Sequence, residues 1–239
     1  MGSPMVKALR GRNTAMLMAL SAALLFGSSV PLAKLMLDTV DPLMLAAFLY
    51  RGSGIGMAAM NLSLRAAGKL SGEAQLKRAD APWLFGALLV GGVAAPVILL
   101  FGLDTTPSST AALLLNFEAI GTVLIASLMF RESVGKRVWL ALAMVTLGGI
   151  ILTVSGNGWG LSLGAVGIIA ACLLWGLDNN LTRNISAKDP LAIVAIKGIG
   201  AGLFSLLLAL LLGCEIPQLS TLAAAMLIGF VCYGMSLYL

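Results

Sequence analysis

The sequence predicts an all-α integral membrane protein, built as a multi-span helical bundle. Eight apolar runs follow one another along the 239 residues, and each is close to the ~20 residues that a helix needs to cross a bilayer. Charged residues make up only 10% of the chain, against about 25% in an average soluble domain. The loops between the runs are short, which leaves little room for a water-soluble domain.

The expected spans cover almost the whole chain after a short basic tail, residues 1–13. Because span follows span after this tail, the first apolar run is interpreted as a retained helix and not as a cleaved signal peptide. The expected spans are residues 14–36, 42–64, 82–103, 109–130, 138–155, 161–182, 190–212 and 219–239.

Among the segments outside the spans, lysine and arginine occur only in the tail and in alternate loops, and this distribution predicts the orientation. Basic residues occur in the tail and after the second, fourth and sixth expected spans. The intervening loops carry no lysine or arginine, and their only charged residues are Asp38, Asp41, Asp104 and Glu215. The positive-inside rule therefore predicts a cytoplasmic N-terminus. The expected location of this multi-pass protein is the cell inner (plasma) membrane. The net charge of +5 is interpreted as this orientation signal and not as a nucleic-acid footprint.

Short patterns recur in the same order in two parts of the chain. Residues 41–43 (Asp-Pro-Leu) recur at 189–191, and the basic, glycine-rich stretch 51–56 recurs at 197–202. The sixth to eighth spans thus copy the first to third, so the repeating unit has five spans. An odd number of spans forces the second copy to enter the membrane from the opposite side.

The predicted organisation is a pair of inverted five-helix repeats. The first covers residues 14–155, and the second covers 156–239, where only three helices are present. We expect the chain to be a fragment or shortened form of a ten-span protein, truncated after the eighth helix. A natural eight-span protein is the alternative.

These residues resemble the drug/metabolite transporter (DMT) superfamily, in its ten-helix EamA-domain branch. The resemblance rests on Phe26-Gly27, Lys34, Asp41-Pro42, Arg51, residues 107–114, Phe130-Arg131-Glu132, Trp175-Gly176, Arg183 and Asp189-Pro190. The chain departs from many members at residues 116–119, where they carry a proline. The resemblance implies a transporter fold whose cargo includes amino acids, nucleosides, sugars and cationic drugs, so it leaves the substrate open.

Ionisable residues inside the expected spans are the candidates for a substrate pathway. Arg51 and Glu118 are expected near mid-bilayer and Lys197 in the outer half of the seventh span. We expect a water-accessible cavity in which Glu118 balances Arg51 or Lys197, leaving net positive charge for an anionic or zwitterionic group. Asn116 and Trp175 complete the expected pathway. The alternative is a static buried ion pair that locks the helices together.

Three polar residues near the cytoplasmic end of the sixth span form a second candidate group. Asp178, Asn179 and Asn180, together with Glu118, are candidates for proton coupling or an inward gate. The alternative is that Asp178 caps the helix end and pairs with Arg183.

Two glycine series satisfy the GxxxG pattern, whose small residues let helices approach closely. We expect helix packing at Gly52, Gly54, Gly56, Gly198, Gly200 and Gly202.

Several classes of chemistry are disfavoured by composition. The chain has no histidine, and its three cysteines (Cys172, Cys214 and Cys232) contain no CxxC pair. A zinc site, a disulfide framework and a Ser-His-Asp triad are therefore not expected. We expect no metal and no cofactor. The expected partners are a small-molecule substrate and the lipid bilayer, without nucleic acid, and a homodimer is left open.

The resulting hypothesis is a secondary transporter, specifically an exporter, that moves small metabolites across the inner membrane by alternating access. Amino acids or related zwitterionic or anionic compounds are the expected cargo. One alternative is a transport-incompetent truncated fragment or scaffold. An intramembrane enzyme is a weaker alternative, because it needs an activated nucleophile or clustered metal ligands that the sequence does not offer, so no enzyme is expected.

Overall fold

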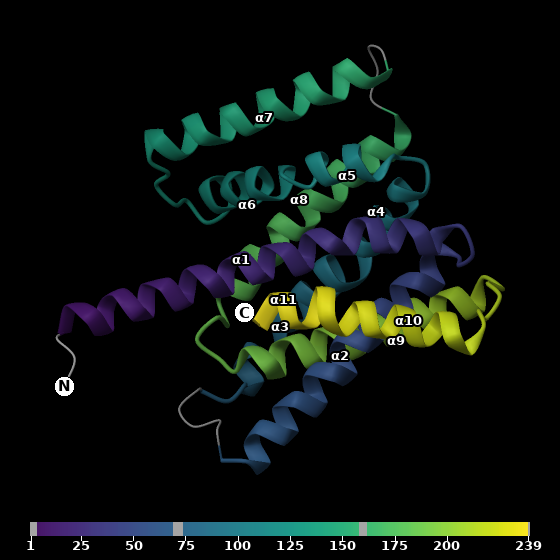
Figure 1. Cartoon of the computed structure of the whole chain (residues 1–239), viewed down its shortest axis with the longest axis horizontal. Coiled ribbons are helices and arrows are strands. Elements are labelled where there is room, and N and C mark those ends of the chain that lie inside the picture. The colour runs from purple at the N-terminus through teal and green to yellow at the C-terminus, as the bar shows by residue number, and fades with distance from the viewer. Residues whose placement is uncertain (1–3, 69–73, 158–161, 239) are drawn as a thin grey trace.

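The computed structural model describes residues 4–68, 74–157 and 162–238, and within these ranges the chain is a bundle of helices (Figure 1). In chain order the helices are α1 (Pro4–Leu37), α2 (Pro42–Ala66), the 3-10 helix η1 (Arg78–Asp80), α3 (Ala81–Ala87), the π-helix η2 (Leu88–Ala94), α4 (Ala95–Asp104), α5 (Ser108–Leu114), α6 (Phe117–Leu128), α7 (Lys136–Asn157), α8 (Leu163–Arg183), α9 (Pro190–Leu211), α10 (Leu219–Ile228), the π-helix η3 (Gly229–Met235) and α11 (Ser236–Tyr238).

Seven helical segments among the described residues are long and apolar enough to cross a membrane. They are Asn13–Leu37, Pro42–Ala66, Arg78–Asp104, Ser108–Leu128, Leu163–Arg183, Pro190–Leu211 and Leu219–Tyr238. Each coincides with an expected span, and α7 covers the remaining one, which was expected at residues 138–155. The predicted all-α, multi-span membrane class is therefore confirmed.

The repeated Asp-Pro pattern begins α2 and α9 in the same way. Asp41 Oδ1 accepts a hydrogen bond from the backbone N–H of Leu43 at 2.8 Å. Asp189 Oδ1 accepts one from the N–H of Ala192 at 3.2 Å. In both helices proline follows as the first helical residue, where its missing N–H costs nothing.

The fourth span is broken, although the sequence predicts one continuous helix over residues 109–130. α5 ends at Leu114 and α6 begins at Phe117. The side chain of Asn116 donates to the carbonyl oxygen of Leu113 at 2.9 Å, so a side-chain bond competes with the helical pattern at this point. The break places Glu118 in the first turn of α6, where the helix dipole favours a carboxylate.

The third and eighth spans each contain a π-helical segment that the sequence did not predict. η2 carries Gly91 and Gly92, and η3 begins at Gly229. At Gly229 an added Cβ would lie 1.9 Å from the carbonyl oxygen of Leu49, so α2 approaches this backbone too closely for any side chain. Wide π-helical turns are frequent at functional sites.

α2 and α9 pack against each other along the middle of the bundle. An added Cβ at Gly198 would lie 2.5 Å from the backbone nitrogen of Gly54, so the two helices nearly touch. At every position of both glycine series an added Cβ would meet a neighbouring helix within 3 Å. Beyond this pair, α1 and α2 contact η3, while α8 and α9 contact η2. The π-helical segment of each expected unit thus packs against helices of the other unit, which is the arrangement expected of inverted units. The repeat itself stays a prediction.

The largest hydrophobic core lies toward the end of the bundle where α1 ends and α2 begins, here called the α1–α2 end. Its buried residues include Val30, Ala33, Leu43, Met44, Leu45, Leu99, Leu100, Leu103 and Ile168. Lys34 joins α1 to the end of α4 at the same end of the bundle. Its ammonium group donates to the carbonyl oxygens of Leu103, at 2.8 Å, and Asp104. A cation at the C-terminal end of α4 is favoured by the helix dipole.

The opposite end, where α8 ends and α9 begins, is more open and is here called the α8–α9 end. The N-terminal half of α1 extends beyond the bundle (Figure 1), and its Leu17, Leu20 and Leu24 are exposed. α7 lies along the outside of the bundle, against α5 and α6. Exposed apolar side chains on spans such as α1 are the surface that lipid covers.

Filling the contact between α2 and α9 is expected to destabilise the fold. Gly198→Val forces the two backbones apart and should cost about 1–3 kcal/mol of unfolding free energy. Gly27→Val is the matched control, because an added Cβ at Gly27 has no atom within 4 Å. Thermal unfolding in detergent should show a lowered midpoint for Gly198→Val only. Equal midpoints for the two variants would contradict the close contact.

Candidate functional site

A cavity of about 550 Å³ lies in the middle of the bundle, between helices of both sequence halves. α1, α2, η2, α6, α8, α9, η3 and α11 all contribute to its wall. The cavity reaches Ser186 and Pro190 at the α8–α9 end, and the main core packs toward the other end. Its size lies within the range of small-molecule sites.

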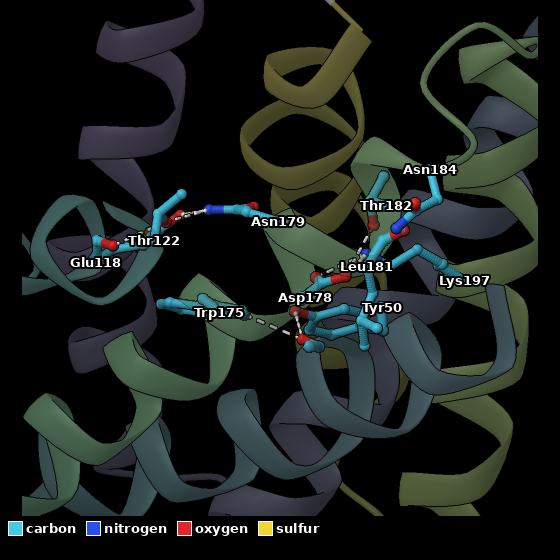
Figure 2. Close-up of polar contacts among 11 residues, drawn as sticks. Tyr50, Glu118, Thr122, Trp175, Asp178, Asn179, Leu181, Thr182, Asn184 and Lys197 are labelled. Carbon is cyan, nitrogen blue, oxygen red and sulfur yellow. Dashed lines mark hydrogen bonds and ion pairs between the residues drawn. The ribbon is translucent and has the colours of Figure 1, made fainter. Parts of the chain in front are cut away.

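Glu118 projects from the first turn of α6 into one side of this cavity. The side-chain amide of Asn179 on α8 donates to Glu118 Oε1 at 2.9 Å and contacts the hydroxyl of Thr122 at 3.1 Å (Figure 2). Both partners are neutral. The negative charge of Glu118 is therefore hydrogen-bonded and is not balanced by these neighbours.

Asp178 and Lys197 form an ion pair. In the view of Figure 2, this pair and Glu118 lie on opposite sides of Trp175. Lys197 Nζ donates to both carboxylate oxygens of Asp178, at 2.6 and 2.7 Å. Thr182 donates to Asp178 Oδ1 at 3.0 Å. The two charged side chains are only 9% (Asp178) and 16% (Lys197) exposed, so each depends on the other for neutralisation.

Four aromatic side chains form a connected wall of the cavity, called here the aromatic wall: Phe26, Tyr50, Trp175 and Tyr233. Phe26 makes edge-to-face contacts with Trp175 and Tyr233, at centroid distances of 6.2 and 6.1 Å. The indole N–H of Trp175 donates to the carbonyl oxygen of Gly91 in η2 at 3.0 Å. This bond fixes the ring of Trp175, because a buried indole N–H needs an acceptor.

Of the five residues expected in the substrate pathway, three line the cavity and two do not. Glu118, Trp175 and Lys197 line it. Asn116 is exposed beside the helix break. Arg51 lines a second cavity of about 320 Å³ between α2, α9 and α10, with its guanidinium 6.0 Å from the ring centre of Phe48.

The partner of Glu118 is Asn179, and not Arg51 or Lys197 as expected from the sequence. Neither Arg51 nor Lys197 pairs with Glu118 in the described part of the chain, because Arg51 faces the second cavity and Lys197 is bound to Asp178. Lys197 also lies in the half of α9 nearer Pro190, and so not in the outer half of its span under the predicted orientation. The net positive cavity charge expected from the sequence does not result from this placement.

The second candidate group is divided in the same way. Asp178 and Asn179 line the cavity, whereas Asn180 is buried and donates to the carbonyl oxygens of Thr122 and Gly176, at 2.9 and 2.8 Å. The alternative in which Asp178 caps the helix end and pairs with Arg183 is wrong. Asn184 donates to the final carbonyls of α8, and Arg183 pairs with Glu132.

Sequence reasoning missed several residues at the site: Thr182, Tyr50 and Tyr233 line the cavity, and Thr122 accepts from Asn179 beside it. Thr122 and Thr182 each follow a carboxylate, Glu118 and Asp178, by one helical turn, so helical spacing could have identified them. Tyr50 and Tyr233 carried no such signal, because their neighbours in space come from distant parts of the chain.

Ion pairs connect the segments at the α8–α9 end. Asp189 is only 3% exposed and accepts from Asn61 at 2.9 Å and from Arg65 at 2.8 Å. Burial acts to raise the pKa of the Asp189 carboxyl, but the hydrogen bonds from Asn61, Arg65 and the N–H of Ala192 hold this pKa below its usual value. Asp189 is therefore charged at neutral pH and fastens α9 to the end of α2.

Removing either member of the buried pair should destabilise the protein more than removing both. Asp178→Asn and Lys197→Met each leave one charge without its partner, at an expected cost of about 3–5 kcal/mol. The double variant removes both charges and should recover at least half of that loss. Thermal unfolding of the four proteins in detergent measures the coupling. Additive losses would show that the pair is not coupled.

Comparison with known proteins agrees with the helical architecture. The sequence pattern of the EamA-like transporter family matches residues 13–154. An uncharacterized transporter from Methanothermobacter thermautotrophicus is 30% identical over 216 residues, which cover 83% of this chain. The chain spans 62% of the length of that relative. A solved crystal structure covering 94% of this chain and 76% of its own chain superposes with a TM-score of 0.69 at 20% identity, so it shows a shared fold. The chain therefore belongs to the EamA-like transporter family.

Proposed function

We propose that the protein is a secondary transporter that carries small metabolites through the central cavity by alternating access. The observation that supports this most directly is the position of the cavity, which lies among membrane-spanning helices of both halves and contains ionisable side chains. Ionisable groups at membrane depth are costly, so their concentration around one cavity favours a functional role.

The proposed mechanism uses two inverted units, residues 14–155 and 156–239. Three observations support them: the exchanged packing of η2 and η3, the π-helical segment in each of the third and eighth spans, and the close pairing of α2 with α9. In transporters built from inverted repeats, one unit rocks against the other around a fixed site. The glycine contact between α2 and α9 offers a surface for such movement.

The cavity is proposed to face the cytoplasm in this conformation. It reaches Ser186 and Pro190 at the α8–α9 end, and the same end carries basic residues such as Arg65, Arg183 and Lys188. The positive-inside rule places such residues on the cytoplasmic side of a plasma membrane. A cavity that loads from the cytoplasm suits export.

Glu118 is the better candidate for proton coupling. Asp178 is neutralised by Lys197, whereas Glu118 has the neutral amide of Asn179 as its partner. Protonating Glu118 therefore removes a charge that its neighbours do not balance, which makes it the group whose protonation state can change during a transport cycle.

Flux should depend on Glu118 and not on Arg51. Glu118→Gln keeps the shape of the side chain, removes its charge and should lower the initial rate about tenfold or more. Arg51→Gln removes a charge at similar depth but outside the central cavity, so its flux should stay near that of the wild type. The measurement is saturable uptake of labelled metabolites into vesicles that contain the purified protein.

Three results of this assay would count against the proposal. Equal flux through Glu118→Gln and wild type would remove Glu118 from the pathway. Loss of flux in Arg51→Gln alone would move the pathway to the second cavity. Absence of saturable flux for every metabolite would favour the scaffold alternative.

Accessibility tests the proposed direction of the opening. In a cysteine-free background, Ser186→Cys should react with a membrane-impermeant maleimide added from the cytoplasmic side. Ser29→Cys is the matched control, because Ser29 is only 1% exposed and should stay unlabelled from either side. Labelling of Ser186→Cys from outside the cell would reverse the proposed orientation.

A further inference from the structure

We infer that the cargo of the central cavity is an organic amine carried as a monovalent cation. Its ammonium group binds Glu118, and its carbon skeleton packs against the aromatic wall. This inference rests on the proposed function, because it assigns a cargo to the same cavity.

The charge balance of the cavity supports a cation. Three charged side chains line it, two carboxylates and one ammonium group, in the part of the chain that the structure describes. Lys197 is bound by both oxygens of Asp178, so these two charges cancel. The charge of Glu118 is left over. A cationic ligand would balance it and form a charge-assisted hydrogen bond.

The nitrogen donors that line the cavity, on Trp175, Asn179 and Lys197, are already hydrogen-bonded, and this disfavours a carboxylate on the ligand. The indole N–H of Trp175 is bound to Gly91, and the side-chain amide of Asn179 is bound to Glu118 and Thr122. A ligand carboxylate that approached Lys197 would have to displace Asp178, which would leave that buried carboxylate without its counter-ion. The cavity therefore favours an amine over the corresponding amino acid.

In the described part of the chain, one side-chain donor binds the Glu118 carboxylate: Asn179, which binds Oε1. The second oxygen of Glu118, Oε2, is the acceptor that a ligand ammonium group can take without breaking an existing bond. An available acceptor, together with donors that are already hydrogen-bonded, favours a ligand that donates hydrogen bonds, such as an amine.

The aromatic wall provides the second half of the binding site. Phe26, Tyr50, Trp175 and Tyr233 all line the cavity, and their ring contacts hold them as one surface. Aromatic faces attract cations and also bury apolar skeletons, so a hydrophobic amine gains from both interactions. The volume of about 550 Å³ is sufficient for an arylalkyl amine.

Three ligands that share a phenylethyl skeleton separate the charge classes: phenethylamine (cation), phenylalanine (zwitterion) and 3-phenylpropionate (anion). Calorimetric titration of the purified wild-type protein should give a dissociation constant for phenethylamine about tenfold or more below those of the other two. Equal or tighter binding of phenylalanine, tighter binding of 3-phenylpropionate, or no binding of any of the three would overturn the inference.

Variants then locate the site. Glu118→Gln should weaken phenethylamine binding about tenfold or more, and Phe26→Leu, which removes a ring, about threefold. Arg51→Gln should bind phenethylamine like the wild type, because Arg51 lines the second cavity. Unchanged affinity in Glu118→Gln would overturn the assignment. The ligand series on the wild type still tests the inference if a variant does not fold.

Flux measurements keep this inference distinct from the proposed function. Saturable flux of labelled phenylalanine without flux of phenethylamine would overturn the cationic cargo and leave the transporter proposal standing. Tight binding of phenethylamine without saturable flux would leave the cation site standing and overturn transport. Saturable phenethylamine flux that Glu118→Gln abolishes would support both.

Discussion

The cost of holding charged groups at membrane depth constrains the middle of this bundle more than any other factor. Lys197 and Asp178 meet this cost by pairing across α8 and α9, with Thr182 as an additional donor. Glu118 meets it differently, through the N-terminal turn of α6 and the amide of Asn179. Because α8 supplies a partner to both groups, its position fixes α6 on one side of the cavity and α9 on the other. The break in the fourth span contributes to this stabilisation, since it creates the helix N-terminus beside Glu118.

The close contact of α2 and α9 explains why two basic residues at matching positions of a repeated pattern face different cavities. An added Cβ at Gly202 would lie 2.6 Å from Cγ of Arg51, so the stem of Arg51 crosses the glycine surface of α9 and its guanidinium lies over Phe48. The side chain of Lys197 reaches from α9 to Asp178 on α8 and lines the central cavity. Packing geometry, and not residue type, separates the two cations. The charge of the central cavity is set by this separation.

The fold was largely predictable, and the partners of the site residues were not. Span positions depend on runs of apolar residues, and the Asp-Pro starts of α2 and α9 are local signals, so both can be read along the chain. The choice of Glu118, Asp178 and Lys197 also followed from local reasoning, because an ionisable residue in a span needs a reason to be there. Which carboxylate meets Lys197 depends on the rotation of α8 relative to α9, and hydropathy does not record that rotation. Of the aromatic wall, Trp175 was expected in the pathway, whereas Tyr50 and Tyr233 were missed for the same reason, since their ring contacts join distant segments.

The two π-helical segments also change how the spans that contain them must be aligned with related sequences. A π turn holds one residue more than an α turn, so the side chains beyond it are rotated by about 100° relative to an uninterrupted helix. α4 can therefore pack against α2 and α8, while η2, in the same span, packs against α8 and α9. A relative that lacks the extra residue would keep both ends of the span and lose the wide turn. A single-residue gap near Gly91 or Gly229 in an alignment would thus mark a change of helix geometry and not an error of register.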